Sequence, residues 1–376
     1  MTKLLFVVTE DWYFCSHRLS LAKSIKEKGF EVVVATRISA CEEQITAAGI
    51  RIIKLKQLKR SSLNPIQEWL AFWELLSVFR NERPDIVHNV ALKPVIYGSF
   101  AAKIIGVPAV VNAIAGMGFI FSSKKKLAFF LKPLMTLFFR FIFNSPNSRL
   151  ILQNLDDFNF MEKIAHVHGN NLRLIPGAGV DIENYIKVEM SKSDPIAMLA
   201  SRMIWDKGIG EFVNAARALK TAGCDARFVL VGAPDGENPL SITENELRKW
   251  QQEGVIEWWG HRMDMPTVLS KARVFCLPTY YGEGVPKVLL EAMAVERPII
   301  TTEMPGCRDL VKANSNGFLV PPRDVNELSK KLHYLLNDVA LCIKMGKEGR
   351  RIVEKEHTTA HVTKRTLEIY DELLKK

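Results

Sequence analysis

Short apolar runs alternate along the chain with amphipathic segments of helical period. The first run covers residues 3–9, a helical pattern follows at 16–28, and a second run covers 31–35. This alternation is typical of parallel strands joined by covering helices. We therefore predict a doubly wound parallel sheet in the first part of the chain. Its further strands are expected at 86–88, 109–112 and 150–153.

The same alternation restarts after a polar stretch at residues 166–172. Four further apolar runs follow, at 196–200, 228–231, 274–277 and 299–301. A chain of 376 residues also exceeds what one hydrophobic core usually holds. We expect an α/β protein with two Rossmann-like domains, residues 1–170 and 171–355, that face a central cleft.

The last part of the chain, residues 326–376, has helical patterns and no convincing strand. Such a tail either closes the second domain or returns to the first. We expect residues 356–376 to form a C-terminal helix that can cross back to the N-terminal domain.

The segment 124–143 departs from this rhythm because its apolar residues are mostly Phe. At about 100° per residue, Lys125, Lys132, Thr136 and Arg140 lie within about 80° of one another, as in a basic amphipathic helix. Lys132, Pro133 and Arg140 interrupt it too often for a transmembrane span, whereas a helix lying in the bilayer interface tolerates them. The alternative is a core helix with a solvated basic edge. The residues expected at the membrane are Lys124, Lys125, Lys126, Phe129, Phe130, Lys132, Phe138 and Arg140.

Nearly all of the net charge of +10 belongs to the N-terminal half. Residues 1–170 contain 22 Lys and Arg against 13 Asp and Glu, and the remainder contains 29 against 28. A basic half indicates an anionic partner surface, for which nucleic acid, anionic lipid and phosphorylated substrates are all candidates. We expect no nucleic-acid partner, because the cations accompany a Phe-rich segment and no recognised nucleic-acid motif.

The cysteines and the N-terminus indicate a cytoplasmic protein. The six cysteines lie far apart and form no CxxC or Cys/His cluster, so neither a disulfide framework nor a metal site is predicted. The first apolar run meets Glu10 and Asp11 too early for the core of a signal peptide. We expect a first strand there, in a reducing compartment.

Two glutamates bracket a strand-to-helix transition in the second half. Glu283 lies on the loop before the helix, and Glu291 lies about two turns further on. Gly284 permits close approach of the backbone, and Pro286 lies early in a helix expected at 285–294. The unpaired N–H groups of a helix start suit a diphosphate. The alternative is a capped helix with two surface glutamates.

Two cations follow the expected strand 196–200. Arg202 and Lys207 precede the next helical pattern, at 211–220. In an open α/β sheet ligands bind at this edge, where cations neutralise charge on a departing diphosphate. The alternative is that both are ordinary solvated side chains.

These stretches together resemble the retaining family 4 glycosyltransferases of GT-B fold, which use nucleoside-diphosphate sugars. The resemblance implies that Arg202 and Lys207 bind the donor diphosphate. It implies that Glu291 binds the ribose and Glu283 the donor sugar. The backbone of Gly284, Val285, Pro286 and Lys287 would help hold phosphate, and His261, Arg262 and Met263 would approach the nucleobase. The matching stretches are Ser201–Gly208, Trp259–Asp264, Glu283–Glu291, Pro305–Asp309 and Gly317–Pro322.

The N-terminal half is similar to this family through three shorter stretches, 14–18, 85–88 and 116–118. Many relatives have a glycine pair in the first loop and a histidine near the donor sugar, where this chain has Cys15-Ser16 and Ala113-Ile-Ala115. The resemblance therefore does not extend to a histidine-assisted mechanism. The residues expected near acceptor or donor are His17, Arg18, His88, Gly116 and Gly118.

Within the family, the runs 205–212 and His17-Arg18 resemble bacterial transferases that extend polyprenyl-diphosphate-linked glycans. This resemblance implies a UDP-N-acetylhexosamine or related donor, a lipid-linked acceptor, and a peripheral position on the inner face of the cytoplasmic membrane. No DxD motif is present, so we expect no metal and no cofactor besides the nucleotide-sugar substrate. The alternatives are a sugar-nucleotide epimerase of the same fold and a basic nucleic-acid-binding protein.

Overall fold

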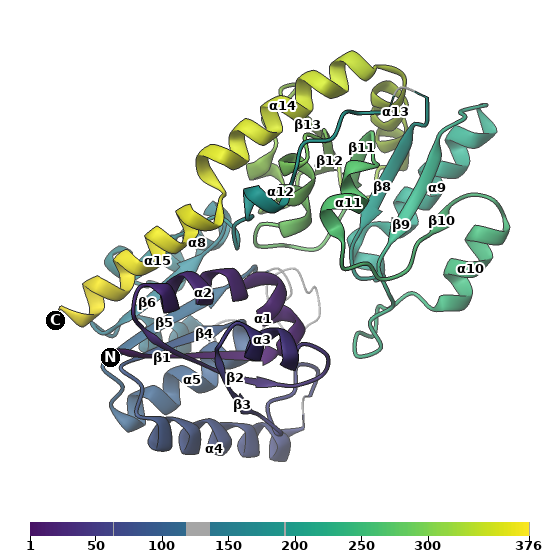
Figure 1. Ribbon diagram of the computed structural model, residues 1–376. Coiled ribbons are helices and arrows are strands. Elements are labelled where there is room, and N and C mark those ends of the chain that lie inside the picture. Colours follow the sequence, from purple (N-terminus) through teal and green to yellow (C-terminus); the bar gives the residue numbers. More distant parts are fainter. Residues whose placement is uncertain (63, 118–135, 192, 376) are drawn as a thin grey trace. The chain divides into compact units, whose positions relative to one another are not determined.

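The structure is a computed structural model, in which residues 1–62, 64–117, 136–191 and 193–375 are described (Figure 1). The chain forms two compact units. The first contains Met1–Gly179 together with Thr359–Lys376, and the second contains Val180–Thr358. Each unit is built on one parallel sheet.

The sheet of the first unit has seven strands in the order β3-β2-β1-β4-β5-β6-β7. These strands read as nearly continuous apolar runs because helices cover both faces. The last strand, β7, extends this unit past residue 170, where the sequence placed the boundary. The strands are β1 (Lys3–Glu10), β2 (Glu31–Arg37), β3 (Arg51–Lys54), β4 (Ile86–Val90), β5 (Ala109–Ile114), β6 (Ser148–Leu152) and β7 (Leu172–Leu174).

Two layers of helices cover this sheet. Helices α2 (Leu19–Glu27) and α15 (Thr359–Leu374) pack on one face, over Phe6 and Val34. Helices α4 (Pro65–Glu82) and α5 (Leu92–Ile105) pack on the other face, together with a helix at 136–143. The unit also contains α1 (Asp11–His17), α3 (Glu42–Ala47) and α8 (Leu155–Lys163).

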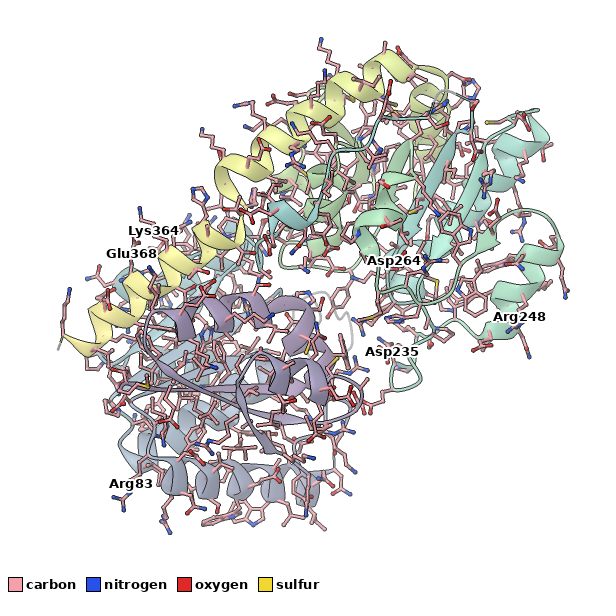
Figure 2. The ribbon with its side chains drawn as sticks, viewed as in Figure 1. Arg83, Asp235, Arg248, Asp264, Lys364 and Glu368 are labelled. Atoms are coloured by element: carbon pink, nitrogen blue, oxygen red, sulfur yellow. The ribbon has the colours of Figure 1, made fainter. Side chains whose placement is uncertain are left out.

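The C-terminal helix α15 belongs to the first unit, although it follows the second unit in sequence. Its buried face includes Tyr370, which lies in the same core cluster as Phe6. Its Glu372 carboxylate pairs with Arg149 and with Arg173, each at 2.5 Å. Lys364 and Glu368 lie on the opposite, solvent-exposed side of the helix (Figure 2).

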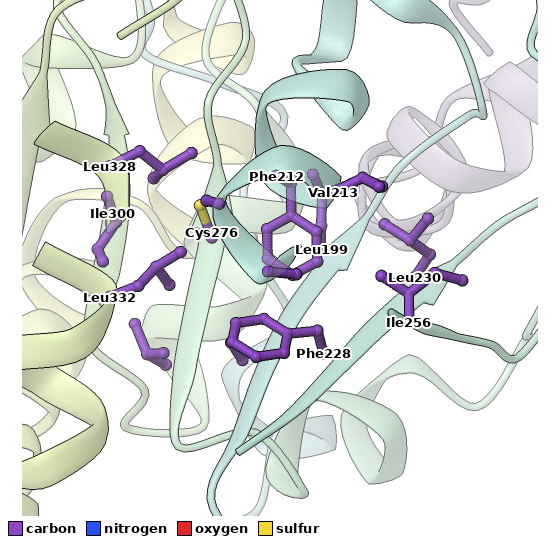
Figure 3. Close-up of a cluster of buried hydrophobic side chains, with 14 of the residues drawn as sticks. Leu199, Phe212, Val213, Phe228, Leu230, Ile256, Cys276, Ile300, Leu328 and Leu332 are labelled. Atoms are coloured by element: carbon purple, nitrogen blue, oxygen red, sulfur yellow. The ribbon is translucent and has the colours of Figure 1, made fainter. Parts of the chain in front are cut away.

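The sheet of the second unit has six parallel strands in the order β10-β9-β8-β11-β12-β13. Its core includes Leu199, Phe212, Phe228, Ile300 and Leu332, contributed by both strands and helices (Figure 3). The strands are β8 (Ile196–Ala200), β9 (Arg227–Val231), β10 (Glu257–Trp258), β11 (Val274–Leu277), β12 (Ile299–Thr302) and β13 (Gly317–Val320). The helices are α9 (Ile209–Thr221), α10 (Glu244–Gln252), α11 (Met265–Ser270), α12 (Lys287–Ala294), α13 (Val325–Asn337) and α14 (Val339–Glu356).

Strand order reverses beside the first strand of each sheet. In the first unit β1 lies between β2 and β4, and in the second unit β8 lies between β9 and β11. Ligands of open α/β sheets bind outside the carboxyl ends of the strands at such a reversal. In the second unit, this rule predicts a ligand at the segments that follow β8 and β11.

The helices of the described ranges include none with the length and apolarity needed to cross a bilayer.

Candidate active site

Residues predicted to bind the diphosphate and the sugar of the donor lie at the carboxyl edge of the second sheet. Arg202 and Lys207 follow β8, and Glu283 follows β11. Because β8 and β11 are adjacent and parallel, their following segments lie side by side. The structure therefore brings together residues that are distant in sequence.

Lys207 and Glu283 form an ion pair in which the ammonium group donates to carboxylate oxygen Oε1. Both side chains are mostly buried. The turn that carries Lys207, Trp205–Lys207, packs directly on the extension of β11. There the Thr279 hydroxyl donates to the Asp206 carbonyl oxygen at 2.9 Å.

Gly208 makes this close packing feasible. It has a φ of 77°, and a Cβ atom at this position would lie 2.0 Å from the carbonyl oxygen of Pro278. A residue with a side chain would push the Lys207 turn away from β11. The glycine therefore helps to set the position of the lysine.

Asp206 and Arg323 are neighbours of this pair that the sequence did not reveal. Burial raises the pKa of Asp206, and the nearby Arg323 and Lys207 oppose that rise. The Arg323 guanidinium carbon lies 4.2 Å from the ring centroid of Tyr280, in a cation–π contact. Arg323 lies just beyond the carboxyl end of β13, after Pro321 and Pro322, so the carboxyl-edge rule could have identified it.

Arg202 is partly exposed and pairs with Asp235 at 2.5 Å. Asp235 lies on the loop that follows β9 (Figure 2). Its backbone N–H donates to the Ser241 hydroxyl oxygen at 2.9 Å, which fixes the loop. Asp235 was not among the predicted residues, although its place after a predicted strand could have indicated it.

Glu291 lies on α12 and has two partners. The buried hydroxyl of Tyr185 donates to its Oε1 at 2.7 Å, and the Lys287 ammonium group lies 2.8 Å from the same oxygen. Burial raises the pKa of Tyr185, and the charge and hydrogen bond of Glu291 add to that rise. The two donors orient the carboxylate. No local pattern in the sequence pointed to Tyr185.

Helix α12 begins later than the sequence predicted. It starts at Lys287 with Pro286 as its N-cap, and the Val285 side chain is buried in the core instead of forming part of the helix. Pro286 has the extended backbone that ends the loop, which explains the shift. The amides of the first turn lack carbonyl partners within the helix, as at every helix start.

Gly284 is packed against a second glycine. Gly306 has a φ of 77°, and a Cβ atom added there would lie 1.4 Å from the Gly284 carbonyl oxygen. The loops after β11 and β12 are therefore in direct backbone contact at the start of α12.

The loop predicted to approach a nucleobase, residues 261–263, follows the edge strand β10 and is exposed. Arg262 pairs with Asp264 at 2.6 Å. The Gly260 carbonyl accepts from the Gly232 N–H at 2.7 Å. Gly232 in turn lies against the Ser201 carbonyl, where a Cβ atom would come within 1.8 Å. These contacts link the loop to the end of β8.

His88 is a core residue, and its predicted contact with a substrate is not supported. The side chain lies inside β4, stacks on Phe6 with 4.9 Å between centroids, and hydrogen-bonds Tyr370 at 2.6 Å. Burial, followed by the nearby Arg18 charge, holds the pKa of His88 well below its usual value. Side chains of a strand alternate between its two faces, and His88 lies on a face that packs into the core. Its position near the end of the predicted strand did not indicate this.

Arg18 differs from the other buried arginines. Its side chain is 4% exposed, and no hydrogen bond or ion pair of its guanidinium is found among the described residues. By contrast, Arg297, 2% exposed, donates to the carbonyls of Val188 and Ser270 at 2.9 and 2.7 Å. Burial lowers the pKa of Arg18, while Tyr13 and Tyr370 oppose that effect. A buried cation without a protein partner is suited to an anion.

The remaining predicted residues of the first unit are less informative. His17 stacks on Tyr13 with 4.2 Å between centroids, and Gly116, with a φ of 89°, follows β5. Phe138 packs on Phe100 at 5.0 Å, and Arg140 is exposed. Gly118 and the predicted membrane residues Lys124, Lys125, Lys126, Phe129, Phe130 and Lys132 lie outside the described residues.

Within the described ranges, no group of three or more His, Cys, Asp or Glu side chains is arranged to hold a metal ion.

Comparison with known proteins identifies both units. Residues 3–154 match the family described as glycosyl transferase 4-like, and residues 194–338 match glycosyl transferases group 1. The chain is 26% identical over 375 residues to N,N'-diacetylbacillosaminyl-diphospho-undecaprenol alpha-1,3-N-acetylgalactosaminyltransferase of Campylobacter jejuni, covering 95% of each chain. It is 27% identical over 296 residues to the UDP-Gal:alpha-D-GlcNAc-diphosphoundecaprenol alpha-1,3-galactosyltransferase of Escherichia coli, covering 75% of this chain and 74% of that one.

Solved structures have the same fold. Sucrose-phosphate synthase of Thermosynechococcus elongatus superposes with a TM-score of 0.81 at 17% identity, over 99% of both chains. HepE of Anabaena, determined with UDP and glucose, superposes with a TM-score of 0.78 at 16% identity, over 99% of this chain and all of the other. The predicted GT-B fold class is confirmed. The chain belongs to the GT-B glycosyltransferases of family 4, with a 4-like domain followed by a group 1 domain, and is an enzyme of this class.

Proposed function

We propose that the protein transfers a sugar from a UDP-sugar to a hydroxyl group of a polyprenyl-diphosphate-linked glycan, with retention at the anomeric carbon. The donor sugar is an N-acetylhexosamine or a related sugar. The observation that carries the proposal is the set of Arg202, Lys207, Glu283 and Glu291 around the carboxyl ends of β8 and β11. The names of the two relatives, both diphospho-undecaprenol glycosyltransferases, support the acceptor class.

Different charged groups of the site would bind different parts of the donor. Arg202, Lys207 and the first amides of α12 would bind the diphosphate, where fixed positive charge stabilises a developing anion. Glu291, oriented by Tyr185 and Lys287, would accept hydrogen bonds from the ribose hydroxyls. Glu283 would bind the sugar.

The two ion pairs of the site keep its cations in place. Lys207 is paired with Glu283 and Arg202 with Asp235. A bound diphosphate would interact with these cations while the carboxylates stay close to them. The segments that carry the cations would not need to move. Preorganised charge of this kind needs little rearrangement when the leaving group develops its charge.

The transfer step balances without a metal ion. The bond between the anomeric carbon and the diphosphate oxygen breaks, and a bond to the acceptor oxygen forms on the same face of the sugar. The leaving diphosphate takes the proton of the acceptor hydroxyl. Arg202 and Lys207 supply the positive charge that a metal ion would otherwise provide.

The first unit is proposed to receive the acceptor. Arg18, which is buried and has no partner among the residues that the structure describes, is suited to a phosphate group of the lipid-linked substrate. The acceptor is anchored in a bilayer, so the enzyme would work peripherally on the inner face of the cytoplasmic membrane.

Thermal-shift measurements with UDP, GDP, ADP and TDP test the nucleotide. UDP is expected to raise the unfolding temperature most. A transfer assay would then combine UDP-N-acetylhexosamines with a polyprenyl-diphosphate-linked sugar. Epimerisation of the sugar nucleotide without any acceptor would instead support the epimerase alternative, and no stabilisation by UDP would contradict the proposal.

A further inference from the structure

Helix α4 carries large apolar side chains on two opposite sides. Ala71 and Leu75 face the sheet and are buried. On the opposite side, Ile66, Trp69, Leu70 and Trp73 are 71%, 61%, 44% and 48% exposed. Their spacing of three and four residues places them on one face. We call these four residues the tryptophan face.

No described part of the first unit covers these four side chains. The aromatic contacts found for the tryptophan face lie within α4 itself. Trp69 contacts Trp73 at 5.6 Å and Phe72 at 6.5 Å between ring centroids. A cluster of exposed aromatic residues marks an interaction surface.

The neighbouring helices extend the apolar surface. Helices α4, α5 and 136–143 pack on the same face of the sheet, so each turns its outer side away from that face. Ile104 on α5 and Leu137 and Phe141 on the helix 136–143 are each more than half exposed. Phe100 of α5 packs on Phe141 at 6.4 Å between centroids, which joins the two helices.

The exposed charges of these three helices are all basic. They are Arg80, Lys103 and Arg140. The acids of the same helices are only partly exposed, and each is engaged. Glu68 pairs with Lys93 at 2.6 Å, Glu82 pairs with Arg51 at 2.5 Å, and Glu74 accepts the Lys56 amide at 2.8 Å. This layer therefore presents apolar residues and positive charge, and two of its three acids are paired with cations.

We propose that the outer side of the α4, α5 and 136–143 layer docks the protein on an anionic bilayer, with the tryptophan face inserted at the interface. Trp, Phe, Ile and Leu bury their apolar bodies at the boundary of the acyl chains, and Lys and Arg attract anionic headgroups. Lys103 combines both roles, since its ammonium group lies 3.6 Å from the ring centroid of Phe141. The inference rests on the proposed function, in which the acceptor is held in the bilayer.

Vesicle sedimentation tests the surface directly. Phosphatidylcholine vesicles with and without phosphatidylglycerol, both lacking any acceptor, are mixed with wild-type protein and the Trp69→Ser/Trp73→Ser variant. Wild-type protein is expected to bind the anionic vesicles in a salt-sensitive manner, with a blue shift of tryptophan emission. The double variant should bind at least tenfold more weakly. Unfolding temperatures of both proteins show that the exposed substitutions leave the fold intact.

A matched control replaces exposed apolar residues of the second unit. Val188→Ser/Tyr334→Ser removes side chains of similar exposure and should bind anionic vesicles as the wild type does. Absence of wild-type binding, or equal binding by the Trp69→Ser/Trp73→Ser variant, would overturn the proposal. The proposal would also be overturned if the wild type were a dimer, this variant were a monomer, and both bound vesicles equally. A second copy of the chain would then be what covers the tryptophan face.

Transfer assays separate this proposal from the proposed function. With a short-chain, water-soluble acceptor, the Trp69→Ser/Trp73→Ser variant should match the wild-type rate. With acceptor embedded in vesicles, its rate should fall about as much as its binding. Vesicle binding without any transfer would refute the proposed function alone. Unchanged transfer to the embedded acceptor would refute the docking surface alone.

Discussion

The ammonium group of Lys207 pairs with the carboxylate of Glu283, although the two residues are 76 positions apart in the chain. They meet because β8 and β11 are adjacent where the strand order of the second sheet reverses. Each holds the other at the carboxyl edge of that sheet, where ligands of such folds bind. This pair is the centre of the proposed donor site.

Removing the Lys207 charge should reduce turnover strongly. In Lys207→Ala the leaving diphosphate loses a fixed cation, and kcat is expected to fall about 100- to 1,000-fold. Steady-state kinetics with a saturating UDP-sugar measure the effect. Arg217→Ala is the matched control, because Arg217 also forms an ion pair, at 2.8 Å with Glu253, on the surface of α9. Turnover by Lys207→Ala equal to that of the control would refute the role of Lys207.

Tyr185→Phe should affect both stability and donor binding. It removes a buried hydroxyl that donates to Glu291 at 2.7 Å, so the free energy of unfolding should fall by about 1–2 kcal/mol. The less firmly oriented Glu291 should raise KM for the donor more than it lowers kcat. Urea denaturation and donor titrations measure the two effects, with the exposed Tyr334→Phe as control. An unchanged KM would show that Tyr185 supports the fold only.

Arg18→Met should separate stability from activity. The substitution removes a buried cation for which no protein partner is found in the described ranges, so the free energy of unfolding should stay constant or rise. Transfer to the phosphorylated acceptor should fall, since the phosphate contact is lost. In contrast, Arg297→Met leaves two carbonyls without their donor and should cost about 1–3 kcal/mol. A similar loss of stability in Arg18→Met would identify Arg18 as structural.

The buried His88 should make stability depend on pH. Its pKa lies well below 6.5 in the folded protein, because of burial and the Arg18 charge, and near 6.5 in the unfolded chain. The unfolded state therefore takes up the proton first as the pH falls. The stabilisation is complete above pH 6.5 and is lost progressively below it.

Urea denaturation at pH 8, 6.5 and 5.5 can measure this effect in wild-type protein and in His88→Gln. The wild-type free energy of unfolding should decline with falling pH more steeply than that of the variant, by up to about 1.4 kcal/mol per pH unit. Parallel curves would show that His88 is not the titrating group.

Chelation should leave the reaction unchanged. Arg202 and Lys207 supply the positive charge at the proposed diphosphate site, so EDTA is expected to have no effect on turnover. The assay compares initial rates with EDTA, with magnesium and with manganese. Loss of activity in EDTA that manganese or magnesium restores would contradict the proposed mechanism.

Several residues of the candidate site could be located from the sequence, because each lies just after a strand that is recognisable from its own apolar run. Arg202, Lys207 and Glu283 follow apolar runs, and parallel strands bring their carboxyl ends to one edge. Asp235 and Arg323 follow strands in the same way and could have been found by the same reasoning. Tyr185 could not, because it precedes the first strand of its sheet and reaches Glu291 only through the packing of the unit.

The sequence alone determined the two parallel sheets, their order along the chain and the edge at which the residues predicted to bind the donor collect, since apolar periodicity and strand direction are local properties. Only the tertiary structure decided which charges pair, that His88 is buried in the core, that Arg18 is buried without a partner in the described residues, and that no described segment covers one side of α4. Partner choice and burial depend on which segments distant in sequence come to lie against each side chain. The sequence of α4 has apolar residues on two sides, and only the packing shows which of them the sheet covers.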